Sequence, residues 1–405
     1  MKKVGFVIPW YGDTIPGGAE ADMRGLAKNM VKRGYEVEIL TTCVKEFSSK
    51  WTENYHKSGI TTEGGLIVHR FPVDKTDAAK FGVVNRKLMM GQHILSASDE
   101  KDFVNEMINS QALYQYIREH KDEYAAFAFI PYMFGTTYHG VQACLEKAVL
   151  IPCFHDEAYT YMRCFRRVYS KVAGMAFHAK PEYELTRKLY HLDDVKCLVV
   201  GGGMDVDLIY DAERFRDKYK IREPFILYAG RKDVGKNIYT LIDYFREYKL
   251  RNPGDLKLVL LGGGAVDIPA EMKEDILDLG FVPIQDKYDA YAAAELLCQP
   301  SKNESFSIVI MESWLCRRPV LVCEDCAVTK NFAIESEGGL YFKDYFDFEG
   351  AVSYIMNHKD IAAQMAENGR NYVLNHFSWD VVVDKYCQLF SEIEKESEAK
   401  KEKHV

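Results

Sequence analysis

Two glutamates, Glu304 and Glu312, stand eight positions apart in the stretch Glu-Ser-Phe-Ser-Ile-Val-Ile-Met-Glu. They follow the apolar run 295–300, an expected strand, and they bracket the expected start of a helix. At about 100° per residue, eight residues turn roughly 800°, so both carboxylates are predicted within about 80° of one helix face. Such a pair at the end of a parallel strand can accept hydrogen bonds from the hydroxyls of a sugar and a ribose. The alternative is two solvated helix carboxylates, because the chain holds 60 acidic residues.

A second candidate is the loop from Trp10 to Glu20, which joins the first expected strand to the first expected helix and contains Gly17 and Gly18. Glycines let a ligand approach the backbone, and the amides and dipole of a helix N-terminus favour a phosphate. The loop has neither the Gly-x-Gly-x-x-Gly nor the Gly-Lys-Ser/Thr pattern, which argues against a nicotinamide dehydrogenase and a P-loop protein. A phosphate-binding turn and a merely flexible turn both remain open.

A third candidate is the loop from Gly230 to Lys236, which follows the expected strand 225–229 and contains Arg231. A guanidinium can hold phosphate oxygens with two hydrogen bonds, and an ammonium adds a point charge. Solvated surface charge is an equal alternative. The glycine triplet 262–264, at the end of another expected strand, indicates either a ligand pocket or a tight turn.

His155 follows the expected strand 149–154. A histidine at that position can bind a sugar hydroxyl or transfer a proton, or it can simply be satisfied by Asp156 or the backbone. A metal site is disfavoured, because no second ligand stands at the spacings that metal motifs use. No metal or other cofactor is expected.

These candidates need a scaffold, and the chain supplies alternating short apolar runs and amphipathic segments. This alternation predicts an α/β fold with parallel sheets covered on both faces. The expected strands are 4–9, 35–42, 66–71, 125–130, 149–154, 174–177, 195–200, 225–229, 256–261, 295–299, 319–323 and 339–342. The expected helices are 19–33, 86–93, 99–120, 238–249, 305–315 and 378–395.

The glycines of Gly201–Asp205 form the best candidate hinge, because three consecutive glycines disfavour the interior of a regular element. Two doubly wound, Rossmann-like domains are therefore predicted, at 1–200 and 205–376, facing each other across a cleft that would hold the ligand. Residues 80–120 are expected to form a helical insert in the first domain. The tail from residue 394 is a run of charges and is expected to fray.

Composition narrows the class of protein. The chain has 405 residues, a net charge of −8 and a pI near 5.8, which argues against nucleic-acid binding. The ten cysteines show no regular spacing, and several, such as Cys153, Cys298 and Cys323, lie inside apolar runs, which suggests buried thiols in a reducing compartment. No apolar run reaches the roughly 18 residues that span a bilayer, and the N-terminus goes directly into a strand without a signal peptide. A cytoplasmic location is expected.

The segment 161–171 mixes basic and aromatic residues. As a helix it would suit an anionic membrane surface or the phosphate of a lipid-linked acceptor, which favours weak peripheral attachment at the inner face of the membrane. A solvated helix face is the alternative.

Taken in order along nearly the whole chain, these motifs resemble the retaining glycosyltransferases of family 4, which have the two-Rossmann GT-B architecture. The resemblance is carried by Gly-Gly-Ala-Glu at 17–20, the strand-end His155, the stretch ending at Asp205, Gly-Arg-x4-Lys at 230–236 and Glu-x7-Glu at 304–312. Phe-Ser-Trp at 377–379 fits as well, at the start of a C-terminal helix, about 378–398, that crosses back to the first domain. The stretch 201–205 departs from the Pro-Asn-Gly-Val-Asp-like sequence usual in the family, and His178 stands where a serine is common.

The resemblance implies a metal-independent transfer of a sugar from a nucleotide-sugar to a glycan or lipid-linked glycan, in surface polysaccharide biosynthesis. It implies that Arg231 and Lys236 bind the diphosphate and stabilise the leaving group, that Glu304 lies near the donor sugar and that His155 contacts this sugar. It further implies donor-binding roles for Gly17 and Gly18 at the phosphates, for Glu312 at the ribose, for Gly280, Phe281 and Val282 at the base, and for Ser305, Phe306 and Ser307 at the sugar hydroxyls. A sugar-nucleotide epimerase on the same fold and a non-catalytic nucleotide-sugar-binding subunit remain as alternatives.

Overall fold

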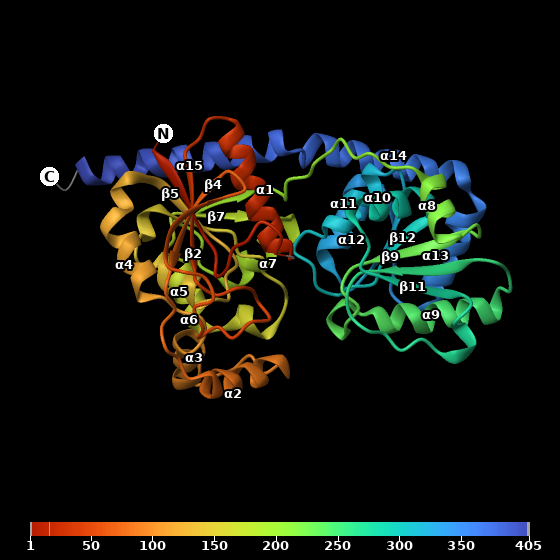
Figure 1. Ribbon diagram of the computed structural model, residues 1–405, viewed down its shortest axis with the longest axis horizontal. Helices are drawn as coiled ribbons and strands as arrows, with labels where there is room; N and C mark the ends of the chain where they lie inside the picture. Colours follow the sequence, from red (N-terminus) through yellow and green to blue (C-terminus); the bar gives the residue numbers. More distant parts are fainter. Residues whose placement is uncertain (1, 16, 403–405) are drawn as a thin grey trace. The chain divides into compact units, whose positions relative to one another are not determined.

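The protein divides into two compact units in the computed structural model, which describes residues 2–15 and 17–402. The N-terminal unit comprises Met1–Gly203 and Trp379–Val405, and the C-terminal unit comprises Met204–Ser378. The chain therefore leaves the first unit within the glycine-rich stretch that was predicted as a hinge, and it returns to that unit for its last helix (Figure 1).

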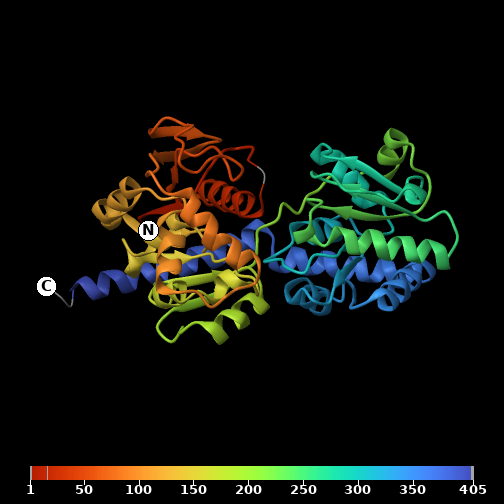
Figure 2. The same cartoon turned by 90° about the horizontal axis from the view of Figure 1, so that it is seen from below.

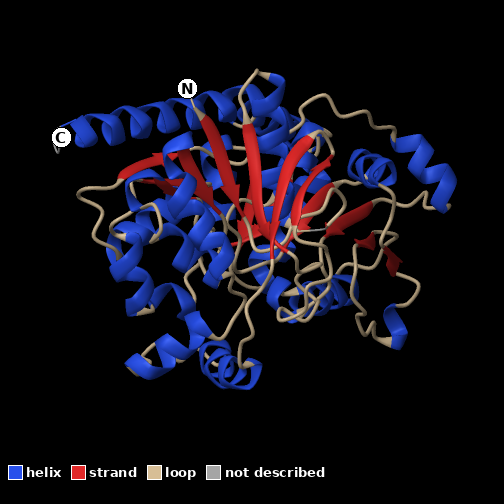
Figure 3. Ribbon diagram, turned by 60° about the vertical axis from the view of Figure 1, so that its left-hand side comes forward, coloured by secondary structure: helices blue, strands red, loops and turns tan. Residues whose placement is uncertain are grey.

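The N-terminal unit is built on an eight-stranded sheet in the order β3-β4-β2-β1-β5-β6-β7-β8. All neighbouring strands run parallel except β3 and β4, which are antiparallel. All residues of β2 and β5 are buried, as expected for a sheet that is covered on both faces (Figure 3). The strands are β1 Lys3–Val7, β2 Val37–Thr42, β3 Gly59–Glu63, β4 Leu66–Phe71, β5 Tyr124–Phe129, β6 Ala148–Leu150, β7 Gly174–Phe177 and β8 Lys196–Val199.

Helices cover both faces of this sheet and form two separate cores. On one face, α1 and α15 contribute Leu26 and Phe390, and the ring of Phe390 packs edge-on against Phe6 of β1. On the other face, α3 and α6 contribute Phe103 and Phe165. The helices are α1 Gly18–Lys32, α2 Ala78–Met89, α3 Ala97–Asn105, α4 Gln111–His120, α5 Gly135–Val141, α6 Arg163–Tyr169, α7 Lys180–Leu189 and α15 Trp379–Glu402.

The region predicted as a helical insert holds three helices, α2, α3 and α4, rather than the two that were predicted. The prediction of one helix over 99–120 is wrong because Asn109 and Ser110 break it. The Asn109 amide donates to the backbone oxygens of Val104 and Met107 at the end of α3. The Ser110 hydroxyl then accepts from Leu113 N at 3.2 Å and caps α4.

The C-terminal unit has a six-stranded parallel sheet in the order β11-β10-β9-β12-β13-β14. Apolar side chains of α9, such as Leu241 and Phe245, share a core with Phe348 of α13. Figure 2 shows α9 as the long green helix of this unit. The strands are β9 Phe225–Ala229, β10 Lys257–Leu261, β11 Ile276–Gly280, β12 Leu296–Gln299, β13 Val320–Cys323 and β14 Gly339–Phe342. The helices are α8 Ala212–Tyr219, α9 Ile238–Arg251, α10 Ile284–Ala293, α11 Ile308–Leu315, α12 Ala327–Ser336, α13 Tyr345–Asn357 and α14 Lys359–His376.

Two edge strands, β3 and β11, were missed from the sequence because β3 is almost wholly exposed and β11 is only partly buried, so neither has a continuous apolar run. The prediction of a frayed tail over 394–405 is wrong up to residue 402, since α15 continues to Glu402, and residues 403–405 lie outside the described part of the chain. The extension is supported by a buried Ile393 and by an ion pair between Lys196 Nζ and Glu396 at 2.8 Å. Within 2–15 and 17–402, no helix is both long and apolar enough to cross a bilayer.

Candidate functional site

The C-terminal sheet changes its direction of growth between β9 and β12. After β9 the sheet extends to β10 and β11 on one side, and after β12 it extends to β13 and β14 on the other. Open parallel sheets bind ligands beyond the carboxyl ends of the strands at such a switch point. The two loops that leave this point contain Arg231 and Lys236 after β9, and Glu304 after β12.

Lys236 and Glu304 join these two loops directly. Lys236 Nζ lies 2.7 Å from Glu304 Oε1, and the two side chains are 23% and 11% exposed. The Asp233 carboxylate accepts from Lys236 N at 3.0 Å. Asn237 adopts a left-handed conformation, and its side-chain amide donates to Pro300 O at 3.0 Å. The loops are therefore tied together by backbone and side chain at the point where a ligand is expected.

Arg231 is held through its backbone, whereas its guanidinium is open to solvent. Its side chain is 73% exposed, and the Asp233 carboxylate lies 3.5 Å away. The Tyr228 hydroxyl donates to Arg231 O at 2.5 Å. Burial, followed by nearby carboxylates such as Glu304, raises the pKa of Tyr228, so its hydroxyl stays a donor. The guanidinium can thus reach a ligand while its base is fixed.

The loop after β9 is anchored by a cation that the sequence analysis did not single out. Lys232 is buried, and its ammonium forms an ion pair with Asp278 of β11. Asp278 also accepts from Gly280 N at 2.9 Å. Close backbone contact completes the anchor: a Cβ at Gly262, where φ is +120°, would lie 2.0 Å from Gly230 O. The glycine triplet therefore allows two loops to touch.

The predicted helix 305–315 begins later than expected, because α11 spans Ile308–Leu315. Ser307 precedes it with a φ of +71°, and Glu304 lies in the loop. The prediction that Glu304 and Glu312 share one helix face is therefore wrong, since the turn of about 100° per residue applies only inside a helix.

The three residues after Glu304 differ in how they are held. Ser305 is half-buried, whereas the buried Phe306 ring packs edge-on against Phe332 with centroids 5.6 Å apart. The Ser307 hydroxyl is buried and has no hydrogen-bond partner among the residues that the structure describes. No side chain caps α11 there. The hydroxyl of Ser307 and the start of α11 are therefore the groups of this loop that a ligand can satisfy.

Glu312 is buried on α11 and both of its oxygens are engaged. Oε1 accepts from Lys287 Nζ at 2.7 Å, and Oε2 accepts from the Tyr291 hydroxyl at 2.9 Å. Burial, followed by the Glu312 charge, raises the pKa of Tyr291, which keeps this hydroxyl protonated. Lys287 and Tyr291 were missed from the sequence, although their spacing of four places them on one face of α10.

The segment predicted to hold the base follows β11. Gly280 has a φ of +66° and ends the strand, and Val282 leads into α10. The Phe281 side chain is 84% exposed, which is unusual for a large apolar ring.

In the N-terminal unit, Gly17 and Gly18 lie at the start of α1, as the predicted phosphate-binding turn requires. A Cβ at Gly17, where φ is +144°, would lie 2.0 Å from a Glu20 carboxylate oxygen, whereas one at Gly18 would meet nothing within 4 Å. Glu20 is fixed by the Trp10 indole, which donates to it at 2.6 Å. No side chain caps α1, and Pro16 of this loop lies outside the described residues.

His155 lies in the loop after β6 and is partly exposed. Its Nδ1 lies 3.4 Å from Glu157 Oε1, and its backbone oxygen accepts from the Thr160 hydroxyl at 2.7 Å. Asp156, the partner considered from the sequence, instead accepts from the Tyr161 hydroxyl at 2.6 Å. Glu157 is therefore the carboxylate that orients His155.

Another histidine, His178, forms a buried polar cluster that the sequence reasoning did not assign. Its Nε2 lies 3.0 Å from Asp22 of α1, and its Nδ1 lies 3.9 Å from the Cys153 thiol. Glu182 accepts from His178 N and from Phe154 N, both at 2.8 Å. Burial opposes the charge of His178, but Asp22 and the Cys153 thiol together outweigh burial and raise the pKa of His178 well above its ordinary value. The signal for this cluster was its place at the carboxyl end of β7.

Residues 211–372 match the family model described as glycosyl transferases group 1. The C-terminal unit is a group 1 glycosyltransferase domain. The matched range contains every predicted site residue of this unit, from Arg231 to Glu312, and the resemblance stated from the sequence is confirmed.

The chain also matches curated relatives. The trehalose synthase of Thermococcus litoralis is 24% identical over 183 residues, which cover 42% of this chain and 44% of that protein. The Campylobacter jejuni N-acetylgalactosamine-N,N'-diacetylbacillosaminyl-diphospho-undecaprenol 4-alpha-N-acetylgalactosaminyltransferase is 30% identical over 165 residues, 39% of this chain and 43% of the relative. The chain thus spans less than half the length of these relatives.

The sucrose-phosphate synthase of Thermosynechococcus elongatus has a similar structure, with a TM-score of 0.71 at 17% identity over 97% of this chain and 99% of that one. The likeness shows the fold. It confirms the predicted class, an α/β protein with two Rossmann-like domains of the GT-B type.

The structure of the glycosyltransferase domain brings Lys236 and Glu304 together and places Glu312 with other partners. The roles of these residues, and those of His155 and the glycines of the N-terminal unit, stay predictions. Over residues 2–15 and 17–402, no group of three or more His, Cys, Asp and Glu side chains is arranged to hold a metal ion.

Proposed function

We propose that this protein is a retaining, metal-independent glycosyltransferase, which moves a hexose from a nucleotide-sugar to a glycan or lipid-linked glycan. The observation that carries the proposal is the contact between Lys236 and Glu304, which sets a cation and a carboxylate at the switch point of a group 1 glycosyltransferase domain. The names of its relatives support it, because each transfers or joins sugars and the Campylobacter jejuni enzyme is named for a diphospho-undecaprenol acceptor. Surface polysaccharide biosynthesis is the process that we propose.

Arg231 and Lys236 would hold the diphosphate of the donor. Breaking the anomeric bond leaves an oxocarbenium-like carbon and a diphosphate whose charge grows, and fixed cations stabilise that charge as it develops. Losing one such group costs about 3–4 kcal/mol, so Arg231→Ala should lower the rate by orders of magnitude. Glu304 would lie beside the donor sugar, and the unsatisfied hydroxyl of Ser307 would bind one of its hydroxyls.

The other predicted site residues would bind the remaining parts of the donor. Glu312 would accept from the ribose hydroxyls, and the exposed Phe281 ring beside Gly280 and Val282 would stack on the base. In the N-terminal unit, the uncapped start of α1 would bind phosphate oxygens, and His155, oriented by Glu157, would bind a sugar hydroxyl.

The test is a thermal-shift panel of UDP-, GDP-, ADP- and dTDP-sugars. A donor at 100 times its Kd should stabilise the protein by about 2.7 kcal/mol. The stabilising donor is then incubated with glycan and lipid-linked acceptors, and NMR reports the anomeric configuration of the product. No shift with any donor would refute the donor site, and turnover of the donor without an acceptor would indicate an epimerase. Activity that is lost in EDTA and restored by a divalent ion would refute metal independence.

We further propose that the protein acts in the cytoplasm with weak peripheral attachment to the membrane. All ten cysteines are free, which supports a reducing compartment. The segment 161–171 offers no apolar face for attachment, because its rings, such as Phe165 and Tyr169, are buried. A surface more suitable for membrane attachment lies at the end of α2, where Met89, Met90 and Ile94 are 72%, 87% and 79% exposed.

This surface is basic as well as apolar, since 78–98 contains Lys80 and Arg86 but no acidic residue. Figure 1 shows α2 on the side of the N-terminal unit opposite to α15. Apolar side chains beside cations suit an anionic lipid surface. Flotation with anionic liposomes at low salt should therefore recover the wild type, and Met90→Gln with Ile94→Gln should abolish recovery. Ile60→Gln, at an exposed position of β3, is the control; no flotation of the wild type would discard attachment.

A further inference from the structure

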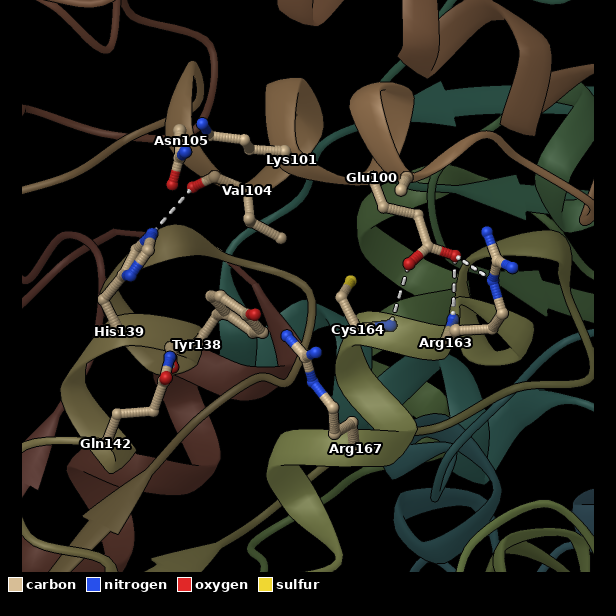
Figure 4. Close-up of a pocket in the computed structure, with 11 residues that line it drawn as sticks. Glu100, Lys101, Val104, Asn105, Tyr138, His139, Gln142, Arg163, Cys164 and Arg167 are labelled. Carbon is tan, nitrogen blue, oxygen red and sulfur yellow. Dashed lines mark hydrogen bonds and ion pairs between the residues drawn. The ribbon is translucent and has the colours of Figure 1, made fainter.

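A cavity of about 550 Å³ lies in the N-terminal unit, and its lining includes none of the residues to which donor contacts were assigned (Figure 4). It is bordered by α3, α5 and α6, and its wall is partly apolar through Val104 and Cys164. The buried Tyr138 adds one face of an aromatic ring. A sugar-sized ligand can pack against such a wall.

The charges on the cavity do not balance. Lys101, Arg163 and Arg167 line it together with a single carboxylate, Glu100. Glu100 is already satisfied: Oε1 accepts from Arg163 N and Nε at 3.0 and 3.3 Å, and Oε2 accepts from Cys164 N at 3.0 Å. Figure 4 shows these contacts on the side of the cavity where α6 begins. Glu100 and Arg163 therefore neutralise each other.

Two cations are left over. Within the described part of the chain, neither Lys101 nor Arg167 has a carboxylate within 4 Å. Tyr138 lines the same cavity, and burial is the main cause that raises the pKa of its hydroxyl. His139 adds no charge at neutral pH, because burial lowers its pKa. Both side chains are exposed, and in a chain with a net charge of −8 two cations without an ion pair at one cavity favour an anionic ligand.

We propose that this cavity binds the phosphate ester of a sugar, with Arg167 and Lys101 on the phosphate oxygens and the sugar ring against Tyr138 and Val104. A guanidinium matches phosphate geometry with two hydrogen bonds, and an ammonium adds a second charge. Within the proposed function, on which this role rests, the ligand is the phosphate-bearing part of the acceptor. The phosphate belongs either to a soluble sugar phosphate or to a lipid-linked one.

Isothermal titration with glucose 6-phosphate and glucose 1-phosphate tests binding directly, and glucose is the neutral control. A polyprenyl-diphosphate-linked sugar in detergent micelles is the second ligand. Binding of a soluble ester assigns a soluble source, and binding of the micellar ligand alone assigns a lipid-linked source. Both results support the cavity if Arg167→Gln and Lys101→Gln each weaken binding about 10- to 100-fold, the range for a lost hydrogen bond between charged groups.

Lys188→Gln is the matched control, because it removes one positive charge from an exposed position of α7 in the same unit. It should bind like the wild type. The proposal is overturned if the esters bind no more tightly than glucose, or if Arg167→Gln and Lys101→Gln, at unchanged melting temperature, bind as the wild type does. Stabilisation by the nucleotide-sugar donor should persist in both variants. If no nucleotide-sugar stabilises the protein, the proposed function is refuted, whereas the binding of phosphate esters in the cavity is measured separately and is unaffected by that result.

Discussion

Replacing Glu304 by glutamine should tighten the binding of a nucleoside diphosphate while it slows sugar transfer. In the structure the Glu304 carboxylate occupies one side of the Lys236 ammonium, at 2.7 Å. A diphosphate that binds the other side of the same ammonium meets a repulsive charge. Glutamine keeps the shape and the hydrogen-bond acceptor and removes only that charge.

The magnitude follows from the distances. A phosphate oxygen about 2.8 Å beyond Lys236 Nζ would stand about 5.5 Å from the Glu304 carboxylate. At an effective dielectric constant of about 20, Coulomb repulsion between unit charges at that distance is about 3 kcal/mol. Because both side chains are partly exposed, solvent reduces this value, and we expect about 1–2 kcal/mol. Kd should therefore fall about 5- to 30-fold.

Isothermal titration with the nucleoside diphosphate of the stabilising donor measures this change, and Lys236→Gln should shift Kd in the opposite direction. Glu295→Gln is the matched control. Glu295 forms the same pair with Lys359 at 2.7 Å, but it precedes β12 and so lies at the opposite edge of the sheet. Unchanged or weaker binding by Glu304→Gln, at unchanged melting temperature, would refute the placement of the diphosphate beside Lys236.

Three further predictions concern single positions. His178→Gln should lower the free energy of unfolding by an amount that depends on pH. Because the pKa of His178 is raised in the folded state, its pair with Asp22 stabilises the fold fully below about pH 6.5, and this stabilisation is lost as pH rises through the folded pKa. Urea unfolding should show the difference between wild type and variant shrinking above that pH, by at most about 1.4 kcal/mol per pH unit, and a constant difference would contradict the charged pair. Gly262→Ala should lower the free energy of unfolding by about 2 kcal/mol or more, since its Cβ would strike Gly230 O at a positive φ; a neutral result in thermal denaturation would show that the loops can separate freely. Glu312→Gln should weaken the nucleoside diphosphate about tenfold but the 2′-deoxy analogue much less, and equal losses in titrations of both would remove Glu312 from the ribose.

Much of the fold was predictable because parallel strands that are covered by helices on both faces have a recognisable local sequence pattern. Each strand is a short apolar run, and the amphipathic segments between them indicate helices. Edge strands such as β3 lack this pattern, because many of their side chains are exposed to solvent and need not be apolar. The break between α3 and α4 was missed because it depends on the hydrogen bonds of one residue, Asn109, rather than on periodicity.

The candidate site was predictable to the level of its loops. Charged and glycine residues directly after strands must gather at one edge of a parallel sheet, so Arg231, Lys236 and Glu304 were expected there from the sequence. The individual contacts were not predictable. Glu304 meets Lys236 because it lies in the loop before α11 rather than in the helix. The start of the helix depends on the left-handed conformation of Ser307.

The sequence alone therefore determined the alternation of elements, the two-domain plan and the loops that carry the charges, because these depend on neighbours along the chain. Tertiary structure decided which charged side chains form ion pairs. Lys236 meets Glu304 across 68 positions and His178 meets Asp22 across 156, and no local pattern links residues so far apart. Burial decided which cation can reach a ligand. The packed fold buries Lys232 against Asp278 and leaves the side chain of Arg231 exposed to solvent, although the two residues are adjacent in sequence.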